Sequence, residues 1–346
     1  MINLSDWSLV SISFVFLCAV LVIGWYGIQM TKTARDLAHD TGMGEVLMGA
    51  LFIGASTSLS GITTSVTAAM SGFAQLAVSN SLGGIAAQTA FLAIADIAYR
   101  RANLEHAAAS AENLFMAALL TTLLSIHLLG MAVPDISLWS IHPATFVLIA
   151  VYLLGIHLLA RMHKMPMWLP RKTRDTPTER QGPARLVSKS LTGLWSRFLF
   201  YSTIVSGAGW FLAQLAVPIV ERTGLSYGFV GGIFTAVSTS IPELVVAVTA
   251  VRMGALNLAV GDIIGGNTFD TLFIAASDIA FREGSIYSAF SSAEIFWLAN
   301  SLMMTGVLLM GLVYRQRHGP GNIGLESTVL LLLYSGGVVL LGIGVV

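Results

Sequence analysis

Long apolar runs separated by short polar stretches dominate the hydrophobic pattern of this 346-residue chain. A helix needs about 20 mainly apolar residues to cross the hydrocarbon core of a bilayer, which is about 30 Å thick. Ten such windows stand out, approximately 7–29, 46–70, 73–99, 111–132, 144–160, 197–220, 227–251, 254–281, 288–313 and 323–346. The pattern therefore predicts an all-α polytopic membrane protein with ten transmembrane helices.

Composition supports the membrane class. Hydrophobic residues make up 55% of the chain and charged residues only 10%, against about 25% charged residues in an ordinary soluble domain. The first window opens at Asp6 and Trp7 without a basic start or a small-residue cleavage site, which favours a retained helix over a signal peptide. The single cysteine, Cys18, excludes an internal disulfide and a cysteine-based metal site.

Basic residues are distributed unevenly between the two sides of the predicted bundle. If the N-terminus is outside, sixteen of the 18 Lys and Arg residues lie in or beside the cytoplasmic loops, and only Arg222 and Arg282 lie outside. This asymmetry follows the positive-inside rule. We therefore expect a multi-pass protein of the cell (inner) membrane with both termini outside.

One long connection, 161–196, divides the chain into a first half, 1–160, and a second half, 197–346. Its centre reads RKTRDTPTERQGPAR, which is basic, contains proline and is poor in apolar residues. Such a composition is typical of a mobile linker. Topology control and contact with anionic lipid explain its charge more simply than nucleic-acid binding does, so we expect no nucleic-acid partner.

An internal repeat links the two halves. Residues 56–100 align without a gap on 238–282, and 19 of the 45 positions are identical. The copies are five predicted crossings apart, and because five is odd the second copy enters the bilayer from the opposite side. Two inverted five-helix repeats of this kind are typical of secondary transporters, whose substrate site lies at the midplane between them.

The stretch STSIPELVV at 238–246 places a proline and an acid inside one of the apolar windows. Pro242 removes a helix hydrogen bond and disfavours helix at the preceding residue, so the helix should break near 238–241. Irregular backbone at membrane depth survives only where it lines protein or a water-filled cavity. Thr239, Ser240 and Glu243 surround the break with oxygen atoms, the ligands that hard cations prefer. The sequence therefore predicts a cation site here.

These residues also carry a resemblance to a known family. TSIPEL at 239–244 and GDIIGGNTFD at 261–270 resemble the second α-repeat of the sodium/calcium exchanger (cation/Ca²⁺ antiporter) superfamily. The resemblance implies a cation antiporter with alternating access, in which the first and sixth helices move across a rigid core. It also adds Asp270 to Thr239, Ser240 and Glu243 as a ligand.

The first repeat departs from the family pattern. Thr57 and Ser58 are present, but Ser60 and Gly61 replace the expected Pro-Glu pair, and Gln88 stands where the second motif ends in Asn or Asp. The implied ligand set is Thr57, Ser58, Gln88, Thr239, Ser240, Glu243 and Asp270. Its formal charge is at most −2, which neutralises one Ca²⁺ but balances several Na⁺ poorly.

The expected partners are small inorganic cations and the lipid bilayer, with Ca²⁺, Na⁺ or H⁺ as transported ions, no cofactor and a monomeric transport unit. A non-transporting or ion-sensing exchanger homologue is the alternative, because the first motif is eroded. An enzyme is disfavoured. SLSG at 58–61 is similar to an intramembrane serine-protease motif, but Ser58 stands where that motif needs glycine, and no histidine lies in a late core helix.

Three further acids are assigned from their spacing. Asp96 and Asp278 each precede an arginine by four residues, which predicts helical ion pairs with Arg100 and Arg282. Asp262 stands where the family has Asn and is interpreted as a satisfied acid at a helix start, with a second cation site or a proton step left open.

Overall fold

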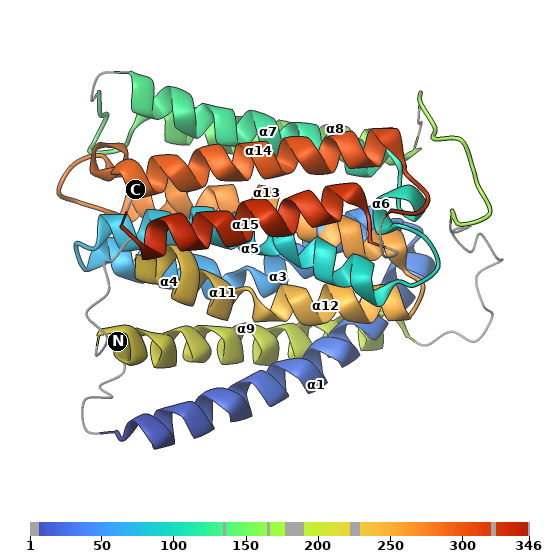
Figure 1. Ribbon diagram of the computed structural model, residues 1–346, viewed down its shortest axis with the longest axis horizontal. Coiled ribbons are helices and arrows are strands. Elements are labelled where there is room, and N and C mark those ends of the chain that lie inside the picture. Colours follow the sequence, from blue (N-terminus) through green and yellow to red (C-terminus); the bar gives the residue numbers. More distant parts are fainter. Residues whose placement is uncertain are drawn as a thin grey trace.

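The computed structural model describes residues 7–133, 136–164, 167–176, 190–221, 229–319 and 323–344. Within these ranges the chain is helical, and its one β-type pairing is an isolated bridge between Leu138 and Ile141. The long helices run roughly parallel or antiparallel to a common direction and form one bundle (Figure 1). The predicted all-α class is confirmed.

Uninterrupted long helices form most of the bundle. They are α1 (Leu9–Thr41), α5 (Ala74–Ala98), α7 (Ala111–Ala132), α8 (Pro143–Lys164), α9 (Leu191–Glu221), α13 (Leu256–Ala280), α14 (Ser292–Tyr314) and α15 (Leu325–Gly342). In the part of the chain that the structure describes, six helices are long and apolar enough to cross a membrane. The number rises to eight if each of two bent helix pairs counts as one crossing. The chain is therefore a multi-pass membrane protein.

The first helix is longer than its apolar window, because α1 continues to Thr41. Met30, Ala34 and Leu37 in this extension are fully buried. Their spacing places them on one helix face, which packs against the rest of the protein. Tertiary packing therefore extends the helix beyond the predicted boundary at residue 29.

Acids and hydroxyls cap the starts of two long helices. Ser291 caps α14 in a capping box with Glu294, whose carboxylate accepts from the Ser291 backbone N–H at 2.8 Å. Ser110 caps α7, and Glu112 lies in its first turn. These groups satisfy N–H donors that a helix start leaves free, and acids also complement the helix dipole.

The repeat found in the sequence recurs element by element in the structure. Its first copy consists of the π-helical segment η1 (Met48–Ile53), α3 (Gly54–Thr57), α4 (Leu59–Met70) and α5. Its second copy consists of η2 (Val230–Thr235), α11 (Ala236–Thr239), α12 (Ile241–Arg252) and α13. Each element of the second copy begins and ends 182 residues after its counterpart. A short helix, α2 (Glu45–Leu47), precedes η1.

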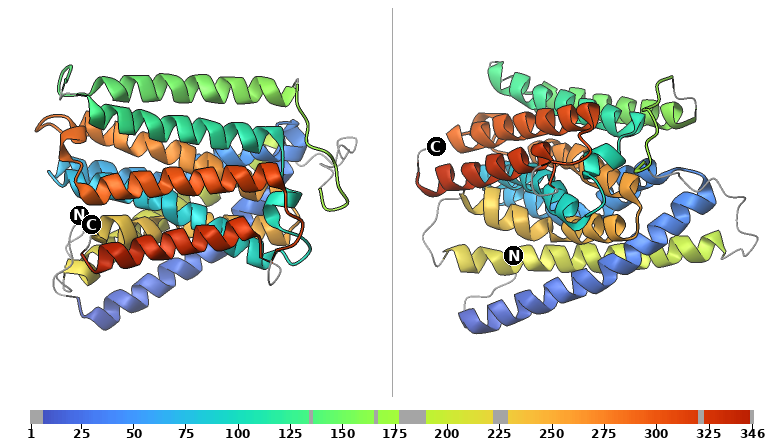
Figure 2. Two further views of the ribbon diagram at one scale, coloured as in Figure 1. Left: turned by 45° about the horizontal axis from the view of Figure 1, so that its top comes forward. Right: turned by 45° about the vertical axis from the view of Figure 1, so that its right-hand side comes forward.

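The central helices α5 and α13 lie side by side and run in opposite directions (Figures 1 and 2). Each is crossed closely by the π-helical segment of the other copy. A Cβ atom on Gly83 of α5 would lie 2.1 Å from the carbonyl oxygen of Gly232 in η2, and one on Gly265 of α13 would lie 2.2 Å from Cα of Ala50 in η1. Because both contacts are with backbone or near it, only glycine allows the two copies to approach this closely.

Helices α1 and α9 form a pair along one side of the bundle (Figure 2). Part of their interface is separate from the main hydrophobic core. Ile12 packs with Leu215, and Ala19 and Ile23 pack with Leu212, in two small clusters of their own. The pair therefore has apolar contacts that do not depend on the central helices.

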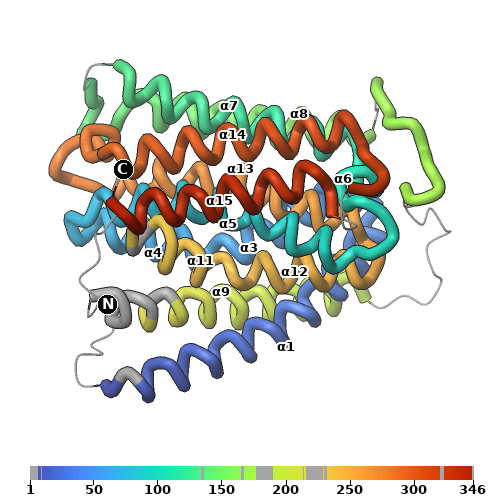
Figure 3. Tube along the Cα trace, viewed as in Figure 1, coloured from blue at the N-terminus to red at the C-terminus, as the bar shows by residue number. Residues whose placement is uncertain are grey.

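Both ends of the predicted linker, 161–196, are helical, because α8 extends to Lys164 and α9 begins at Leu191. Between these two helices, 167–176 and residue 190 are described (Figure 3). Arg317 Nε lies 2.8 Å from the Asp175 carboxylate, and Arg315 donates to the Arg171 carbonyl at 2.6 Å. The rest of the predicted mobile linker lies outside the described residues.

The ion pairs predicted for Asp96 and Asp278 are wrong. Asp96 accepts hydrogen bonds from the backbone N–H groups of Leu104 and Gly324. Asp278 accepts from those of Ile286, in the 3₁₀ turn η3 (Ile286–Ala289), and His142. Free N–H groups in the loops beyond each central helix lie closer than the arginine four residues away. The two acids therefore tie loops to helix ends and are structural.

Candidate cation site at the two helix breaks

Both copies of the repeat break at the same place. The bend is 44° between 45–57 and 59–70, and 49° between 232–239 and 241–252. Ser58 and Ser240 are the residues at the breaks. The break predicted near Pro242 is therefore confirmed, and a matching break occurs in the first copy without a proline.

Ser60 lies between the two breaks. Its hydroxyl is within hydrogen-bonding distance of the Thr57 carbonyl, at 3.1 Å, and of the Thr239 carbonyl, at 3.2 Å. Both carbonyls belong to the last residue before a break, where the regular helical partner is lost. The Ser60 hydroxyl can therefore donate a hydrogen bond to a backbone carbonyl at either break, and it links the two copies.

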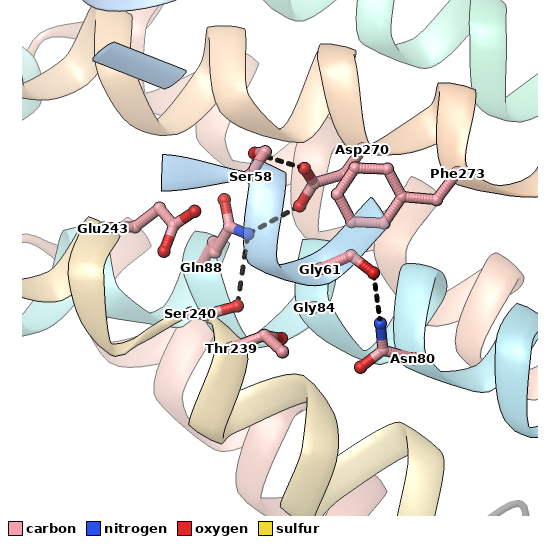
Figure 4. Close-up of a pocket in the computed structure, with 10 residues that line it drawn as sticks. All are labelled: Ser58, Gly61, Asn80, Gly84, Gln88, Thr239, Ser240, Glu243, Asp270 and Phe273. Carbon is pink, nitrogen blue, oxygen red and sulfur yellow. Dashed lines mark hydrogen bonds between the residues drawn. The ribbon is translucent and has the colours of Figure 1, made fainter. Parts of the chain in front are cut away.

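Asp270 of α13 anchors the site. Its two carboxylate oxygens accept from different elements of the first copy, from Ser58 Oγ at 2.5 Å and from Gln88 Nε2 at 2.6 Å (Figure 4). Gln88 Nε2 is also 3.2 Å from Ser240 Oγ. Four of the seven predicted site residues are therefore joined in one hydrogen-bonded cluster. Hydrogen bonds to a charged carboxylate stabilise its ionised form.

Glu243 lies in the first turn of α12, directly after the break, and is 1% exposed. It lines the same small pocket as Ser58, Gln88, Ser240 and Asp270 (Figure 4). Within the described residues no donor reaches its Oε2 atom, nor does one reach Oε1 of Gln88. A buried acceptor without a donor is costly, so both atoms are available to a positively charged ligand.

The two threonines have a different environment. Thr57 Oγ1 bonds to the carbonyls of Ile53 and Gly54, and Thr239 Oγ1 to those of Thr235 and Ala236. Thr239 lines the pocket, whereas Thr57 does not. Both hydroxyls have donated their proton to a helix carbonyl, so they can offer a ligand only oxygen lone pairs.

The pocket also contains residues that the sequence analysis missed as site residues, namely Gly61, Asn80, Gly84 and Phe273. A Cβ atom on Gly61 would lie 2.5 Å from the Phe273 ring. The phenyl ring thus occupies the space that a glutamate side chain at position 61 would need. The only sequence signal was the loss of the expected acid at Gly61, and nothing in the pattern pointed to the ring opposite it.

The interpretation of Asp262 as a satisfied acid at a helix start is wrong. The residue is the seventh of α13 and fully buried. Among the described residues neither of its carboxylate oxygens has a hydrogen-bond donor. The helix begins at Leu256, close to the start of its predicted window at 254, so Asp262 lies almost two turns inside it.

The donor set suits a hard cation. In the described part of the chain, no three His, Cys, Asp or Glu side chains converge as metal ligands. The pocket instead combines two carboxylates with hydroxyl and amide oxygens. Oxygen-only sets of this kind match Ca²⁺ and other hard cations and do not match soft transition metals.

Comparison with known proteins agrees with this chemistry. The family model described as sodium/calcium exchanger protein matches residues 11–165 and 192–342. The chain is 25% identical over 339 residues to “Putative antiporter CaxA” of Alkalimonas amylolytica, covering 95% of this chain and 97% of that protein. It is 29% identical over 121 residues to the sodium/calcium exchanger MaX1 of Methanosarcina acetivorans, covering 35% of this chain and 33% of MaX1.

The fold is also similar to solved structures. A structure of the sodium-calcium exchanger NCX_Mj soaked with Na⁺ and Ca²⁺ superimposes with a TM-score of 0.70 at 14% identity, covering 96% of this chain and 99% of that one. A second NCX_Mj structure, soaked with Na⁺ and Sr²⁺, gives a TM-score of 0.71 at 14% identity over the same shares. At this identity the likeness concerns the fold.

Proposed function

Because the chain belongs to the sodium/calcium exchanger protein family, we propose that this cation antiporter moves Ca²⁺ across the membrane in exchange for Na⁺ or H⁺. Family membership makes the chain a transporter and not an enzyme. Ser60, the residue of SLSG that aligns with the protease nucleophile, has its hydroxyl within hydrogen-bonding distance of the carbonyls of Thr57 and Thr239. No general base of the kind that serine catalysis needs is part of those contacts.

The observation that carries the proposal is the convergence of Glu243 and Asp270 with Ser58, Gln88 and Ser240 at the two breaks. Two carboxylates neutralise the charge of one Ca²⁺, and hydroxyl, amide and carbonyl oxygens complete its coordination. A second ion can bind only after Ca²⁺ has left, because both ions need the same carboxylates. If the empty site cannot switch from one side of the membrane to the other, transport of one ion is coupled to transport of the other.

We further propose ten membrane crossings in two inverted halves, 1–160 and 197–346, with both termini outside the cell (inner) membrane. Support comes from the antiparallel α5 and α13, and from α1 beginning on the side of the bundle where α15 ends (Figure 1). The long helices together with the two bent pairs provide ten segments. The proposed site lies within one chain, so we expect a monomer to transport.

Alternating access would come from movement of α1 and α9 across the remaining helices. These two helices pack along the broken segments, and they share small hydrophobic clusters of their own. A pair with its own apolar contacts can shift as a unit over a core whose glycine contacts allow little movement. Sliding of packed helices is an established mode of conformational change.

Ion flux into proteoliposomes tests the function. Purified protein is reconstituted, and ⁴⁵Ca²⁺ uptake is measured under an outward Na⁺ gradient or under a pH gradient. We expect uptake with the wild type, and loss of uptake with Glu243→Gln, which keeps the shape of the side chain but removes its charge. Glu283→Gln, an exposed loop acid, is the matched control and should transport normally. Equal uptake by wild type and Glu243→Gln would remove Glu243 from the mechanism.

A non-transporting, ion-sensing role is the second candidate, favoured by the Phe273 ring that fills the place of the missing acid. A sensor would bind ⁴⁵Ca²⁺ in a Glu243-dependent way without moving it under any gradient. Equilibrium binding measured on the same reconstituted samples separates the two functions.

A further inference from the structure

Asp262 is a buried acid that is not part of the proposed Ca²⁺ site. It is fully buried in α13, eight residues before Asp270. No donor within the described residues reaches either of its carboxylate oxygens. An isolated carboxylate in a low-dielectric interior is strongly unfavourable unless a positive group pairs with it.

The equivalent position in the first copy shows what Asp262 lacks. That position is Asn80, whose amide donates to the Gly61 carbonyl at 3.3 Å and to Ser65 Oγ at 2.9 Å. The residues equivalent to Gly61 and Ser65 in the second copy are Glu243 and Ala247. The repeat therefore places an acid at 262 beside a carbonyl, which is an acceptor, and an alanine, which has no polar side chain. Replacement of the amide by an acid adds charge and no internal contact.

Glu243 is related to Asp262 through the repeat. In the first copy Asn80 reaches the backbone of residue 61, so the repeat places Asp262 beside residue 243. Counted together, the two acids leave three buried carboxylate oxygens without a donor among the described residues, namely Oδ1 and Oδ2 of Asp262 and Oε2 of Glu243. A shared proton bridges two oxygens and leaves the third without a partner, whereas a hard metal cation accepts several oxygen ligands at once.

We propose that Asp262 adds one Na⁺ to each transport cycle by holding it together with Glu243 after Ca²⁺ has left the site that Glu243 and Asp270 form. This inference rests on the proposed antiport function and names its counter-ion. Asp262 supplies the charge that Gly61 and Phe273 exclude from the first copy. Each cycle of the wild type then moves one Na⁺ more per Ca²⁺ than a cycle of a protein without Asp262, and this Na⁺ adds one positive charge to the exchange.

Asp262→Asn tests the proposal in the full chain reconstituted in proteoliposomes. Asparagine is isosteric, and at the equivalent position 80 it makes the hydrogen bonds described above. The Na⁺:Ca²⁺ coupling ratio and the reversal potential are measured at fixed pH, and a second arm replaces the Na⁺ gradient with a pH gradient. We expect Asp262→Asn to move one Na⁺ fewer per Ca²⁺, to shift the reversal potential accordingly, and to retain Ca²⁺/Ca²⁺ exchange.

Asp278→Asn is the matched control, because Asp278 is a buried acid of the same helix that lies outside the pocket and accepts from the backbone of His142 and Ile286 and from the hydroxyl of Thr145. It should lower the melting temperature and leave the coupling ratio unchanged. If Asp262→Asn does not purify as a folded protein, Asp262→Ser is measured in its place.

Three results would overturn the inference. An unchanged coupling ratio in Asp262→Asn refutes it while the antiport function stands. A change confined to the pH-gradient arm also refutes it, since Asp262 would then carry a proton. Absence of any flux with the wild type overturns the proposed function and this inference with it.

Discussion

Phe273 illustrates how one residue alters the chemistry of the site. Its ring is 3% exposed and occupies the space beside Gly61. The first copy is therefore unable to regain its acid by a single substitution, since the side chain would overlap the ring. Loss of the acid and gain of the ring make the two halves of the site unequal, although their backbones match.

We predict that Gly61→Glu alone is destabilising, by about 1–3 kcal/mol or more, because it overfills a packed position and adds a buried charge. Gly61→Glu combined with Phe273→Ala should recover much of that stability, since the ring no longer blocks the side chain. Thermal unfolding in detergent measures both. If Gly61→Glu alone has the same melting temperature as the wild type, the Phe273 ring moves aside without cost and the prediction is wrong.

Glu105 is a second residue whose environment changes its properties, and it lies outside the long helices, in the short helix α6 (Leu104–Ala107). Burial, together with the carboxyl groups of Asp96 and Glu326, raises the pKa of Glu105 to about 8 from the ordinary 4.5. Between these two values the folded protein keeps a proton that the unfolded chain has lost. The contribution of Glu105 to stability therefore falls as the pH rises from about 5 to about 8.

We expect Glu105→Gln to flatten the decline in melting temperature across this pH range and to be the more stable protein above it. Melting curves at several pH values for the wild type, Glu105→Gln and the exposed control Glu283→Gln measure the effect. Parallel curves for all three proteins would contradict the assignment.

At the scale of elements, the two broken helices show that proline is not what makes the break. The first copy bends by 44° with Ser60 where the second has Pro242. Both breaks follow a π-helical segment packed on the central helix of the other copy, and Ser60 bonds carbonyls on both sides. The break is a property of how the two copies pack.

Ser60→Ala should accordingly lower stability more than Pro242→Ala does. Loss of the hydroxyl leaves buried carbonyls without a donor, at about 1–3 kcal/mol. Loss of the proline ring chiefly restores freedom to the unfolded chain, at about 0.4–1 kcal/mol. Denaturation of both variants in detergent ranks them. If Pro242→Ala lowers stability more than Ser60→Ala does, proline and not packing causes the break.

Contacts between the central helices and the π-helical segments depend on glycine in both copies. Gly83→Ala and Gly265→Ala place a methyl group within 2.1 Å and 2.2 Å of atoms on the crossing segment. We expect each to cost about 1–3 kcal/mol, because backbone there has no room to move. Gly306→Ala in α14 is the control, as nothing lies within 4 Å of its added Cβ, and it should change stability by less than about 0.5 kcal/mol. Equal melting temperatures for all three would refute the close crossing.

At the scale of the whole molecule, the proposed inversion of the two halves predicts that equivalent loops lie on opposite sides of the membrane. Arg101 and Glu283 occupy equivalent positions of the two copies and are both exposed. They come shortly after α5 and α13 in the chain, and these two helices end on opposite sides of the bundle (Figure 1). The repeat thus places equivalent positions at opposite ends of the bundle, which we expect to lie on opposite sides of the membrane.

A Cys18→Ser background permits a labelling test of this topology. In intact cells a membrane-impermeant maleimide should label Glu283→Cys, and it should label Arg101→Cys only after permeabilisation. Labelling of both from the same side would exclude the inverted arrangement, and labelling in the reverse order would place both termini inside.

Much of this protein follows from sequence alone. Apolar runs determine which segments can cross the bilayer, since hydrocarbon accepts little else, and the repeat at 182 residues determines that two copies of one unit exist. Thr239, Ser240 and Glu243 were identifiable because polar groups around a helix break in an apolar run are costly without a ligand or partner, whereas Asp270 was implied by the family resemblance. Helix ends such as that of α1 were less predictable, because packing decides how far a helix extends.

Tertiary structure alone decided how the two copies complete each other. Gln88 and Ser58 belong to one copy and bind Asp270 of the other, Phe273 fills the place left by Gly61, and Asp262 is left without a partner. These relations join residues up to 212 positions apart. Hydrophobic periodicity describes which face of an element is buried, but it does not specify which side chain of the partner lies against it.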